Sequence, residues 1–265
     1  MKSPRFEDLT ETTGIPLSAE GAEMMYTRYA AGAELARGKR VLEIGCGAGQ
    51  GLALLSRSAK LVVGGDYSMA LLRSGRAHYG DLQRLVRMTA EDLPFREASF
   101  DVVLFFEASY YVPRMTSAFD ELTRIVAPGG TVLFVNANPE RPDFITSPHS
   151  THYHTAAEFR SELERRGFVV SVEGAFPVEP PATGVVAQLK GLALRLARTV
   201  LEALHLVPRT LRGRARLKRL VYGKLIEVPA ELPEGFAPVA QRAPIGTGPV
   251  TSFKVLYVTA VKPPV

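Results

Sequence analysis

The sequence has little cysteine and no long apolar run. Cys46 is the single cysteine among 265 residues, so an intrachain disulfide is impossible, as is usual in a reducing compartment. The first nine residues hold four charged side chains and no apolar stretch, so we expect no secretory signal peptide. No 18 apolar residues follow one another without a charge, so no membrane-spanning helix is predicted. From these absences we expect a cytoplasmic protein.

Positive charge is concentrated in one segment. Apolar residues make up 46% of the chain, and its length allows one α/β domain with an elaboration. The net charge is +5, yet residues 181–226 alone hold ten Lys/Arg against one acid. This segment has a single aromatic residue, Tyr222, which is too few for base stacking. We therefore expect no nucleic-acid partner.

Short apolar segments alternate with helical patterns along most of the chain. Strands are predicted at 40–44, 60–66, 86–88, 100–106, 131–135, 168–172 and 253–261, and helices at 17–36, 52–58, 68–77, 116–126 and 155–166. Such alternation predicts parallel pairing with helices on both faces of one sheet. Thr155 and Glu158 are spaced as a capping box, and Gly167 is placed to end that helix.

A glycine-rich turn, Gly45 to Gly51, follows the first predicted strand. Glycines there let the backbone approach a nucleotide-like ligand, although a tight turn alone would also use them. Gln50 stands where the dinucleotide-binding pattern Gly-x-Gly-x-x-Gly requires its third glycine. Glu43, just ahead of the turn, would repel a pyrophosphate but tolerate a cationic ligand. Asp66 ends the second strand, where it would either accept hydrogen bonds from ribose hydroxyls or cap the next helix.

Five segments in order resemble the class I S-adenosylmethionine (SAM)-dependent methyltransferases, in particular the small-molecule, type 11-like branch. Residues 41–49 resemble the first motif of that superfamily, Asp66 falls at its ribose-binding acid, and residues 90–95 are similar to its adenine loop. Residues 100–103 resemble its fourth strand, and residues 122–130 resemble the segment leading into the fifth. The resemblance covers about residues 40–136. It implies a Rossmann-like sheet, SAM as cofactor and S-adenosylhomocysteine as product.

The same resemblance assigns the cofactor contacts. Asp66 would hold the ribose, with Tyr67 and Met69 beside the adenine, and Arg28 of the N-terminal helix would reach the SAM carboxylate unless it is solvated. The full set of implied cofactor-binding residues is Tyr26, Arg28, Glu43, Gly45, Cys46, Gly47, Gly49, Asp66, Tyr67, Met69, Ala90, Glu91, Asp92, Phe106 and Glu107. Cys46 is interpreted as a small residue in a turn, because no partner that would activate its thiol is apparent.

The acceptor should bind beyond the carboxyl ends of the fourth and fifth strands. Tyr110 and Tyr111 follow the fourth strand, and His149, His152 and His154 lie on a loop after the fifth. Histidine suits removal of a proton from an oxygen nucleophile, so these five residues are the catalytic candidates. The alternatives are a polar surface loop, and methyl transfer by positioning without a base. No metal site is predicted, because no carboxylate adjoins the histidines in sequence.

We divide the chain into an N-terminal helical cap (1–36), a SAM-binding core (37–176), a basic helical insert (177–249) and a final strand (250–265). The predicted fold class is α/β, a seven-stranded, mostly parallel, Rossmann-like sheet with helices on both faces and the insert between strands six and seven. An apolar stripe from Leu189 to Leu204 is expected to pack on the core and wall the acceptor site. The basic run from Arg209 to Arg219 is then expected at the pocket rim or in solvent, with membrane binding absent or weak; the alternatives are that it binds an anionic acceptor or, peripherally, a membrane.

The predicted function is SAM-dependent methylation of a small molecule, at a hydroxyl of a sugar or other metabolite that is sugar-linked or anionic. One alternative is N-methylation of a small amine. Another is a non-catalytic SAM-binding protein that docks through its basic insert. The oligomeric state is not indicated by the sequence.

Overall fold

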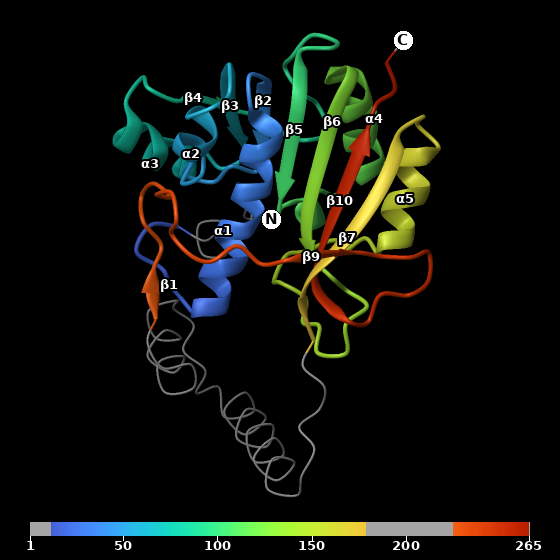
Figure 1. Cartoon of the computed structure of the whole chain (residues 1–265). Coiled ribbons are helices and arrows are strands. Elements are labelled where there is room, and N and C mark those ends of the chain that lie inside the picture. The colour runs from blue at the N-terminus through green and yellow to red at the C-terminus, as the bar shows by residue number, and fades with distance from the viewer. Residues whose placement is uncertain (1–11, 179–224, 265) are drawn as a thin grey trace, which may run out of the picture.

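The computed structural model describes residues 12–178 and 225–264 (Figure 1). The predicted helix from Leu189 to Leu204, its packing on the core and the basic run from Arg209 to Arg219 lie outside these residues. Within the described ranges, no helix combines the length and the apolar character needed to cross a membrane.

Eight strands form one sheet in the order β4-β3-β2-β5-β6-β10-β7-β9. Their bounds are β2 Arg40–Ile44, β3 Leu61–Asp66, β4 Arg84–Arg87, β5 Phe100–Phe106, β6 Val126–Ala137, β7 Val169–Pro177, β9 Arg242–Pro244 and β10 Phe253–Val261. The first five strands in this order, β4, β3, β2, β5 and β6, pair in parallel. In contrast, β10 pairs antiparallel with β6 and β7, and β9 pairs antiparallel with β7. The seven predicted strands are all present, and the short edge strand β9 is an eighth.

The helices are α1 Ala19–Ala36, α2 Leu52–Ser56, α3 Met69–Tyr79, α4 Met115–Ile125 and α5 Ala156–Glu164, with a short 3-10 turn, η2, at Ser109–Tyr111. Each corresponds to a predicted helix except η2. The capping box at the start of α5 is confirmed: the Thr155 hydroxyl accepts from the Glu158 amide, and the Glu158 carboxylate accepts from the Thr155 amide. Ser68 is the N-cap of α3, so Asp66 does not have that role.

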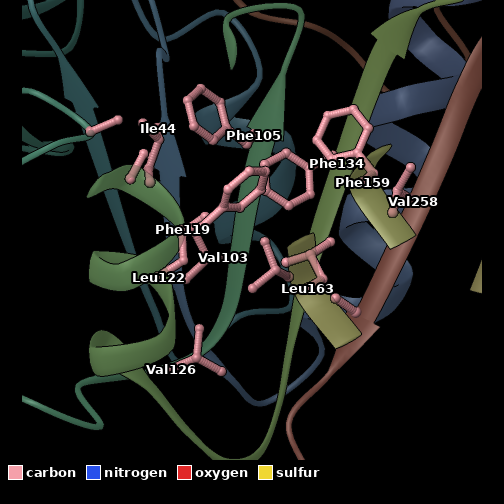
Figure 2. Packing of buried hydrophobic residues seen from close by; sticks show 14 of the residues in the cluster. Ile44, Val103, Phe105, Phe119, Leu122, Val126, Phe134, Phe159, Leu163 and Val258 are labelled. Carbon is pink, nitrogen blue, oxygen red and sulfur yellow. The ribbon is translucent and has the colours of Figure 1, made fainter. Parts of the chain in front are cut away.

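Apolar side chains alternate between the two faces of the sheet, as β geometry requires. On β5, Val103 and Phe105 pack with α4 and α5 in one buried cluster, whereas Val102 and Leu104 belong to a second cluster that includes α1 and α2 residues. Figure 2 shows the first cluster, in which Phe119 of α4 lies close to the sheet. Burial of such a side chain contributes about 1.5–3 kcal/mol, so both helical layers are held by substantial apolar packing.

Residues 228–240, called the strap below, run from the small β1/β8 sheet (Pro16–Leu17 with Ile226–Glu227) toward β9 (Figure 1). The expectation of a helical insert is wrong for residues 225–249, which contain two short strands and no helix. Five prolines within 25 residues explain the difference, because proline removes an amide donor and clashes with the preceding helical turn. They are Pro229, Pro233, Pro238, Pro244 and Pro249.

Candidate functional site

A cavity of about 810 Å³ lies at the carboxyl ends of β2, β3 and β5. Its volume is in the upper part of the range of about 300–1,000 Å³ that is usual for small-molecule sites. We distinguish two walls by their residues. The glycine-loop wall consists of Arg28, Tyr29, Glu43, Gly45, Cys46, Gly47, Gln50, Asp66 and Tyr67, and the tyrosine wall consists of Tyr110, Tyr111, Val112, Pro113, Arg141, Ser147, His149 and Thr151.

The glycine loop needs its glycines for two different physical reasons. Gly45 and Gly47 have φ of +75° and +60°, a region that side chains rarely adopt. A Cβ on Gly45 would also lie 2.5 Å from the Cβ of Ala108. Gly49 lies outside the cavity lining, and its carbonyl accepts a hydrogen bond from the Tyr79 hydroxyl (2.8 Å). Of the loop glycines, Gly45 and Gly47 therefore line the cavity and Gly49 does not.

Cys46 is buried within the same turn. Burial raises the pKa of its thiol well above the ordinary value, with further contributions from the Glu43 and Asp66 carboxylates. A thiol in this state is a poor nucleophile, because the thiolate is the reactive form. The structure therefore places Cys46 in the cavity wall with its thiol protonated.

Asp66 is fixed at the end of β3 by two backbone donors. Its Oδ2 accepts from the Gly47 amide and its Oδ1 accepts from the Ser68 amide, both at 2.8 Å. A carboxylate oxygen can accept more than one hydrogen bond, so these two bonds still allow Asp66 to bind ligand hydroxyls. Tyr67 also lines the cavity, with the Arg87 guanidinium 5.8 Å from its ring centroid. Met69, at the start of α3, does not line the cavity, contrary to its predicted place beside the adenine.

Glu43 is a buried carboxyl at the base of the glycine-loop wall. Its Oε1 accepts a hydrogen bond from the Tyr29 hydroxyl at 2.6 Å. Burial raises the pKa of Glu43 to about 7, despite the opposing effects of the Tyr29 hydrogen bond and the Arg28 charge. A cationic ligand in the cavity would favour the ionised carboxylate, since an opposite charge lowers the pKa of an acid.

Helix α1 presents different residues to the cavity and to the strap. Arg28 is buried and lines the cavity. Tyr26 does not: its hydroxyl accepts a hydrogen bond from the Gly235 amide at 2.5 Å, and Thr27 accepts one from the Ala240 amide at 3.0 Å. The expected cofactor contact of Tyr26 is therefore replaced by a contact with the strap.

The segment after β4 holds three of the predicted cofactor-binding residues, and only two of them line the cavity. Ala90 and Glu91 line the cavity, and Glu91 accepts a hydrogen bond from the Arg114 amide at 2.7 Å. Asp92 is absent from the cavity lining, because a bridge pairs it with Thr89 and turns the chain away. The predicted pair after β5, Phe106 and Glu107, also lines the cavity.

The tyrosine wall is built by ring stacking and hydroxyl contacts. The Tyr110 ring stacks on Tyr153 with centroids 4.2 Å apart, and the Tyr110 hydroxyl donates to Glu107 Oε2 at 3.0 Å. The Tyr111 and Ser147 hydroxyls are 2.5 Å apart. Burial raises the pKa of Tyr110 well above its ordinary value, so this phenol keeps its proton. Both predicted tyrosines therefore lie where an acceptor would be oriented by hydroxyl groups.

His149 is separated from the other two predicted histidines, His152 and His154, whose ring centroids lie 4.6 Å apart. His149 lines the cavity and adopts a positive φ of 66°. His152 Nε2 lies 3.2 Å from Glu158 Oε1, and His154 packs edge-on against Phe119. Because neither His152 nor His154 lines the cavity, proton removal from a bound acceptor by these two does not fit the structure.

No carboxylate adjoins the histidines in the sequence, yet the α5 capping box brings Glu158 beside His152. No group of three His, Cys, Asp or Glu side chains placed to hold a metal ion occurs in the part of the chain that the structure describes. Burial lowers the pKa of His154, which also favours a neutral ring packed against aromatic neighbours.

Several cavity residues were missed by the sequence argument. Tyr29 and Gln50 lie beside residues that were named, and their positions next to Arg28 and Gly49 were the available signal. Arg141 and Lys254 had no local signal, because the fold brings them to the cavity from distant segments. Lys254 donates to Glu20 at 2.6 Å, which joins β10 to the start of α1.

A glycine loop and a carboxylate at the ends of adjacent parallel strands are typical of α/β proteins that bind nucleotide-like cofactors. Residues 42–134 match the family model described as "Methyltransferase domain". This match and the fold together support a class I, SAM-dependent methyltransferase.

Curated relatives are similar over part of their length. One is the phthiotriol/phenolphthiotriol dimycocerosates methyltransferase 1 of Mycobacterium ulcerans, 40% identical over 43% of each chain. Another is the fatty-acid O-methyltransferase of Mycolicibacterium smegmatis, 38% identical over 48% of each chain. The matched region thus spans less than half the length of these relatives.

Solved structures resemble the chain over most of its length. The YcgJ protein of Bacillus subtilis has a TM-score of 0.57 at 17% identity, covering 90% of this chain and 99% of its own. A SAM-dependent methyltransferase of Mesorhizobium loti has a TM-score of 0.53 at 17% identity, covering 90% and 97%. At this identity the likeness concerns the fold.

Proposed function

We propose that this protein transfers the methyl group of SAM to an oxygen atom of a small, largely apolar acceptor. The observation that carries the proposal is the single cavity shared by the glycine-loop wall and the tyrosine wall. Such a cavity places two bound molecules side by side, which is what direct group transfer requires.

The glycine-loop wall fits SAM in charge and shape. SAM supplies an electrophilic methyl group on a sulfonium, and it carries an ammonium, a carboxylate, a ribose and an adenine. Glu43 offers a buried carboxylate to the cationic part, and Gly45 and Gly47 offer a surface without side chains. Asp66 would accept from the ribose hydroxyls, and Ala90 and Glu91 would lie at the adenine edge.

The acceptor side of the cavity favours an apolar molecule over a bare sugar. Besides the polar residues of the tyrosine wall, apolar side chains from three segments line the cavity, namely Met24, Met25, Val112, Pro113 and Val255. The names of the two Mycobacteriaceae relatives refer to dimycocerosates and to a fatty acid. We therefore infer a lipid-like acceptor with a hydroxyl or carboxyl group.

The tyrosine wall would position the acceptor and remove its proton. Tyr110 and Tyr111 present hydroxyl groups to orient the reacting oxygen. His149 is the cavity-lining histidine, and its imidazole would take the proton of an acceptor hydroxyl as the new bond forms. A carboxylate acceptor would be ionised already and would need only positioning.

The test is a transfer assay with methyl-labelled SAM and three acceptor classes: hydroxylated or carboxylated long-chain lipids, sugars and small amines. We expect label in an oxygen-linked methyl group of a lipid. Label in an amine alone would favour the N-methyltransferase alternative and overturn the proposal. Tighter calorimetric binding of NAD than of SAM would overturn the cofactor assignment itself.

A further inference from the structure

Arg141 is a cation of the tyrosine wall whose charge is only weakly paired. It lines the cavity, its side chain is 20% exposed, and its buried Nε has no hydrogen-bond partner among the described residues. The Asp143 carboxylate lies 3.6 Å from this Nε, which is beyond hydrogen-bond distance, and is 60% exposed to screening water. Buried polar groups are almost always hydrogen-bonded, so this donor marks a place for an anionic group of a ligand.

The backbone that carries Arg141 is held against the segment leading into β10. The Asn138 side-chain amide donates to the Val250 carbonyl at 2.7 Å and to the Phe253 carbonyl at 2.8 Å. Its Oδ1 accepts from the Glu140 amide at 3.1 Å, and Glu140 Oε2 accepts from the Val250 amide at 3.2 Å. Glu140 lies outside the cavity lining. Arg141 therefore starts from a fixed backbone, which lowers the entropy cost of binding a ligand.

Aromatic rings connect the Arg141 guanidinium to the rest of the tyrosine wall. Its central carbon lies 5.9 Å from the Phe144 ring centroid, and Phe144 packs edge-on against Tyr153 with centroids 4.7 Å apart. Tyr153 in turn stacks on Tyr110. A guanidinium packed against a ring keeps its in-plane N–H donors for other partners. The guanidinium thus belongs to the wall that we assign to the acceptor.

The other Lys and Arg side chains among the described cavity residues have different surroundings. Lys254 Nζ donates to Glu20 Oε1 at 2.6 Å, so its charge is paired. Arg28 belongs to the glycine-loop wall, where its charge lowers the pKa of Glu43 against the larger effect of burial. Arg141 is therefore the cation best placed to meet a negative charge on the acceptor.

We propose that Arg141 binds an oxyanion group of the acceptor, a carboxylate or a phosphate, and that the acceptor is an anionic amphiphile. This assignment rests on the proposed function. A guanidinium presents paired N–H donors that match two oxygens of such a group. The apolar side chains of the same cavity would hold the hydrocarbon chain. A neutral lipid would cover the guanidinium without supplying a countercharge, so the cavity selects against it.

The experiment is calorimetry on the full chain saturated with S-adenosylhomocysteine, which has no methyl group to transfer, so binding is measured apart from catalysis. The probes are octanoate, octyl phosphate and octan-1-ol. We expect at least one anionic probe to bind about tenfold or more tightly than octan-1-ol, and the tighter one identifies the oxyanion. Acetate and inorganic phosphate, which lack the chain, should bind at least about tenfold more weakly than their octyl counterparts.

Arg141→Gln should weaken the anionic probes and reduce their preference over octan-1-ol to less than about threefold. Arg141→Lys keeps the charge but not the paired donors, so it should retain part of the preference. Arg160→Gln is the matched control, because Arg160 is similarly buried (24% exposed) but lies outside this cavity. It should leave the preference unaltered. If Arg141→Gln does not fold by circular dichroism, Arg141→Met supplies a neutral side chain that should cause the same loss.

Four results would overturn the assignment. The parent would bind octan-1-ol as tightly as both anionic probes, or the neutral Arg141 variant would keep the parent's preference. The free anions would bind as tightly as their octyl counterparts, or the neutral variant would weaken S-adenosylhomocysteine about tenfold, which would assign Arg141 to the cofactor. Octan-1-ol binding in these cases would leave the lipid-like acceptor of the proposed function standing. Failure of S-adenosylhomocysteine, or of all three octyl compounds, to bind would overturn the proposed function itself.

Discussion

The glycine-loop wall and the tyrosine wall enclose one cavity but are built from different interactions. The first depends on backbone: Gly45 and Gly47 adopt positive φ, and backbone amides hold Asp66. The second depends on side chains, with Tyr110 stacked on Tyr153 and Tyr111 in contact with Ser147. A wall made of backbone groups restricts which residues can occupy its positions. A wall made of side chains can change its shape by substitution. We therefore expect the first wall to set cofactor binding and the second to set acceptor choice.

The largest expected effect tests the tyrosine wall. His149→Ala should lower turnover of a hydroxyl acceptor by roughly 10²–10⁴, with SAM affinity unchanged, because proton removal is lost while the cofactor contacts remain. His152→Ala is the matched control, since His152 lies outside the cavity and contacts Glu158. Steady-state kinetics with calorimetry on both variants checks this. Parent-like turnover in His149→Ala would show that the wall acts by positioning alone.

The next effect tests the glycine-loop wall. Asp66→Ala should weaken SAM binding by about 1–3 kcal/mol for each hydrogen bond to a ribose hydroxyl that is lost. Asp81→Ala, which removes an exposed carboxylate outside the cavity, should have no effect on SAM affinity. Calorimetry measures both variants. Equal SAM affinity in Asp66→Ala and the parent would show that Asp66 does not bind the cofactor. The glycine-loop wall would then no longer differ from the tyrosine wall in setting cofactor affinity.

Glu43 makes the stability of this wall depend on pH. The pKa of Glu43 rises from 4.5 to about 7 on folding, so the folded protein holds the proton more tightly than the unfolded chain does. Stability therefore falls as pH rises through this interval, by up to about 3 kcal/mol above pH 7. Glu43→Gln carries no titrating group and should remove this contribution. Without ligand it should be more stable than the parent at about pH 8, and closer to it near pH 5.

Urea denaturation at the two pH values checks the Glu43 prediction. In parallel, SAM affinity of the parent should rise as pH increases through about 7, because the ionised carboxylate attracts the cationic ligand. The Gln variant should bind SAM more weakly and show little of this dependence. If the parent instead gained stability relative to the Gln variant between pH 5 and 8, the predicted sign would be wrong.

The smallest expected effect concerns the tyrosine wall again. Tyr153→Phe keeps the ring that stacks on Tyr110 but removes the oxygen that accepts from the Ser147 amide at 3.0 Å. The loss of one such hydrogen bond costs about 1 kcal/mol, so KM for the acceptor should rise a few-fold while SAM affinity is unchanged. Kinetics with varied acceptor concentration checks this. A matching loss of SAM affinity would mean that the two walls are coupled.

More of the glycine-loop wall than of the tyrosine wall could be predicted from the sequence, because the first depends on local backbone patterns. Gly45, Gly47 and Asp66 belong to a local pattern, because each is required by a turn or by the end of a strand. Lys254 and Arg141 could not be predicted, since only the completed sheet brings them to the cavity. The separation of His149 from His152 depends on a local loop conformation with positive φ, which a row of histidines does not show.

Helix α1 shows why the spacing of apolar residues did not predict that Tyr26 faces the strap and not the cavity. Residues 25–29 are all buried, because the core lies on one side of the helix and the strap lies on the other. A helix covered on several sides has no clear polar face, so the pattern cannot say which residues face a ligand. The strap itself is rich in proline and carries no strand or helix pattern strong enough to place it beside α1.

The contact between Gly51 and Tyr29 has a consequence for how this sequence can change over time. A Cβ at position 51 would lie 1.8 Å from the Tyr29 ring, and that ring carries the hydroxyl bound to Glu43. The two positions are therefore expected to vary as a pair among descendants of this gene. A side chain gained at 51 would be tolerated only after, or together with, a smaller residue at 29. Replacement of Tyr29 by a smaller residue would also remove the hydroxyl that donates to Glu43.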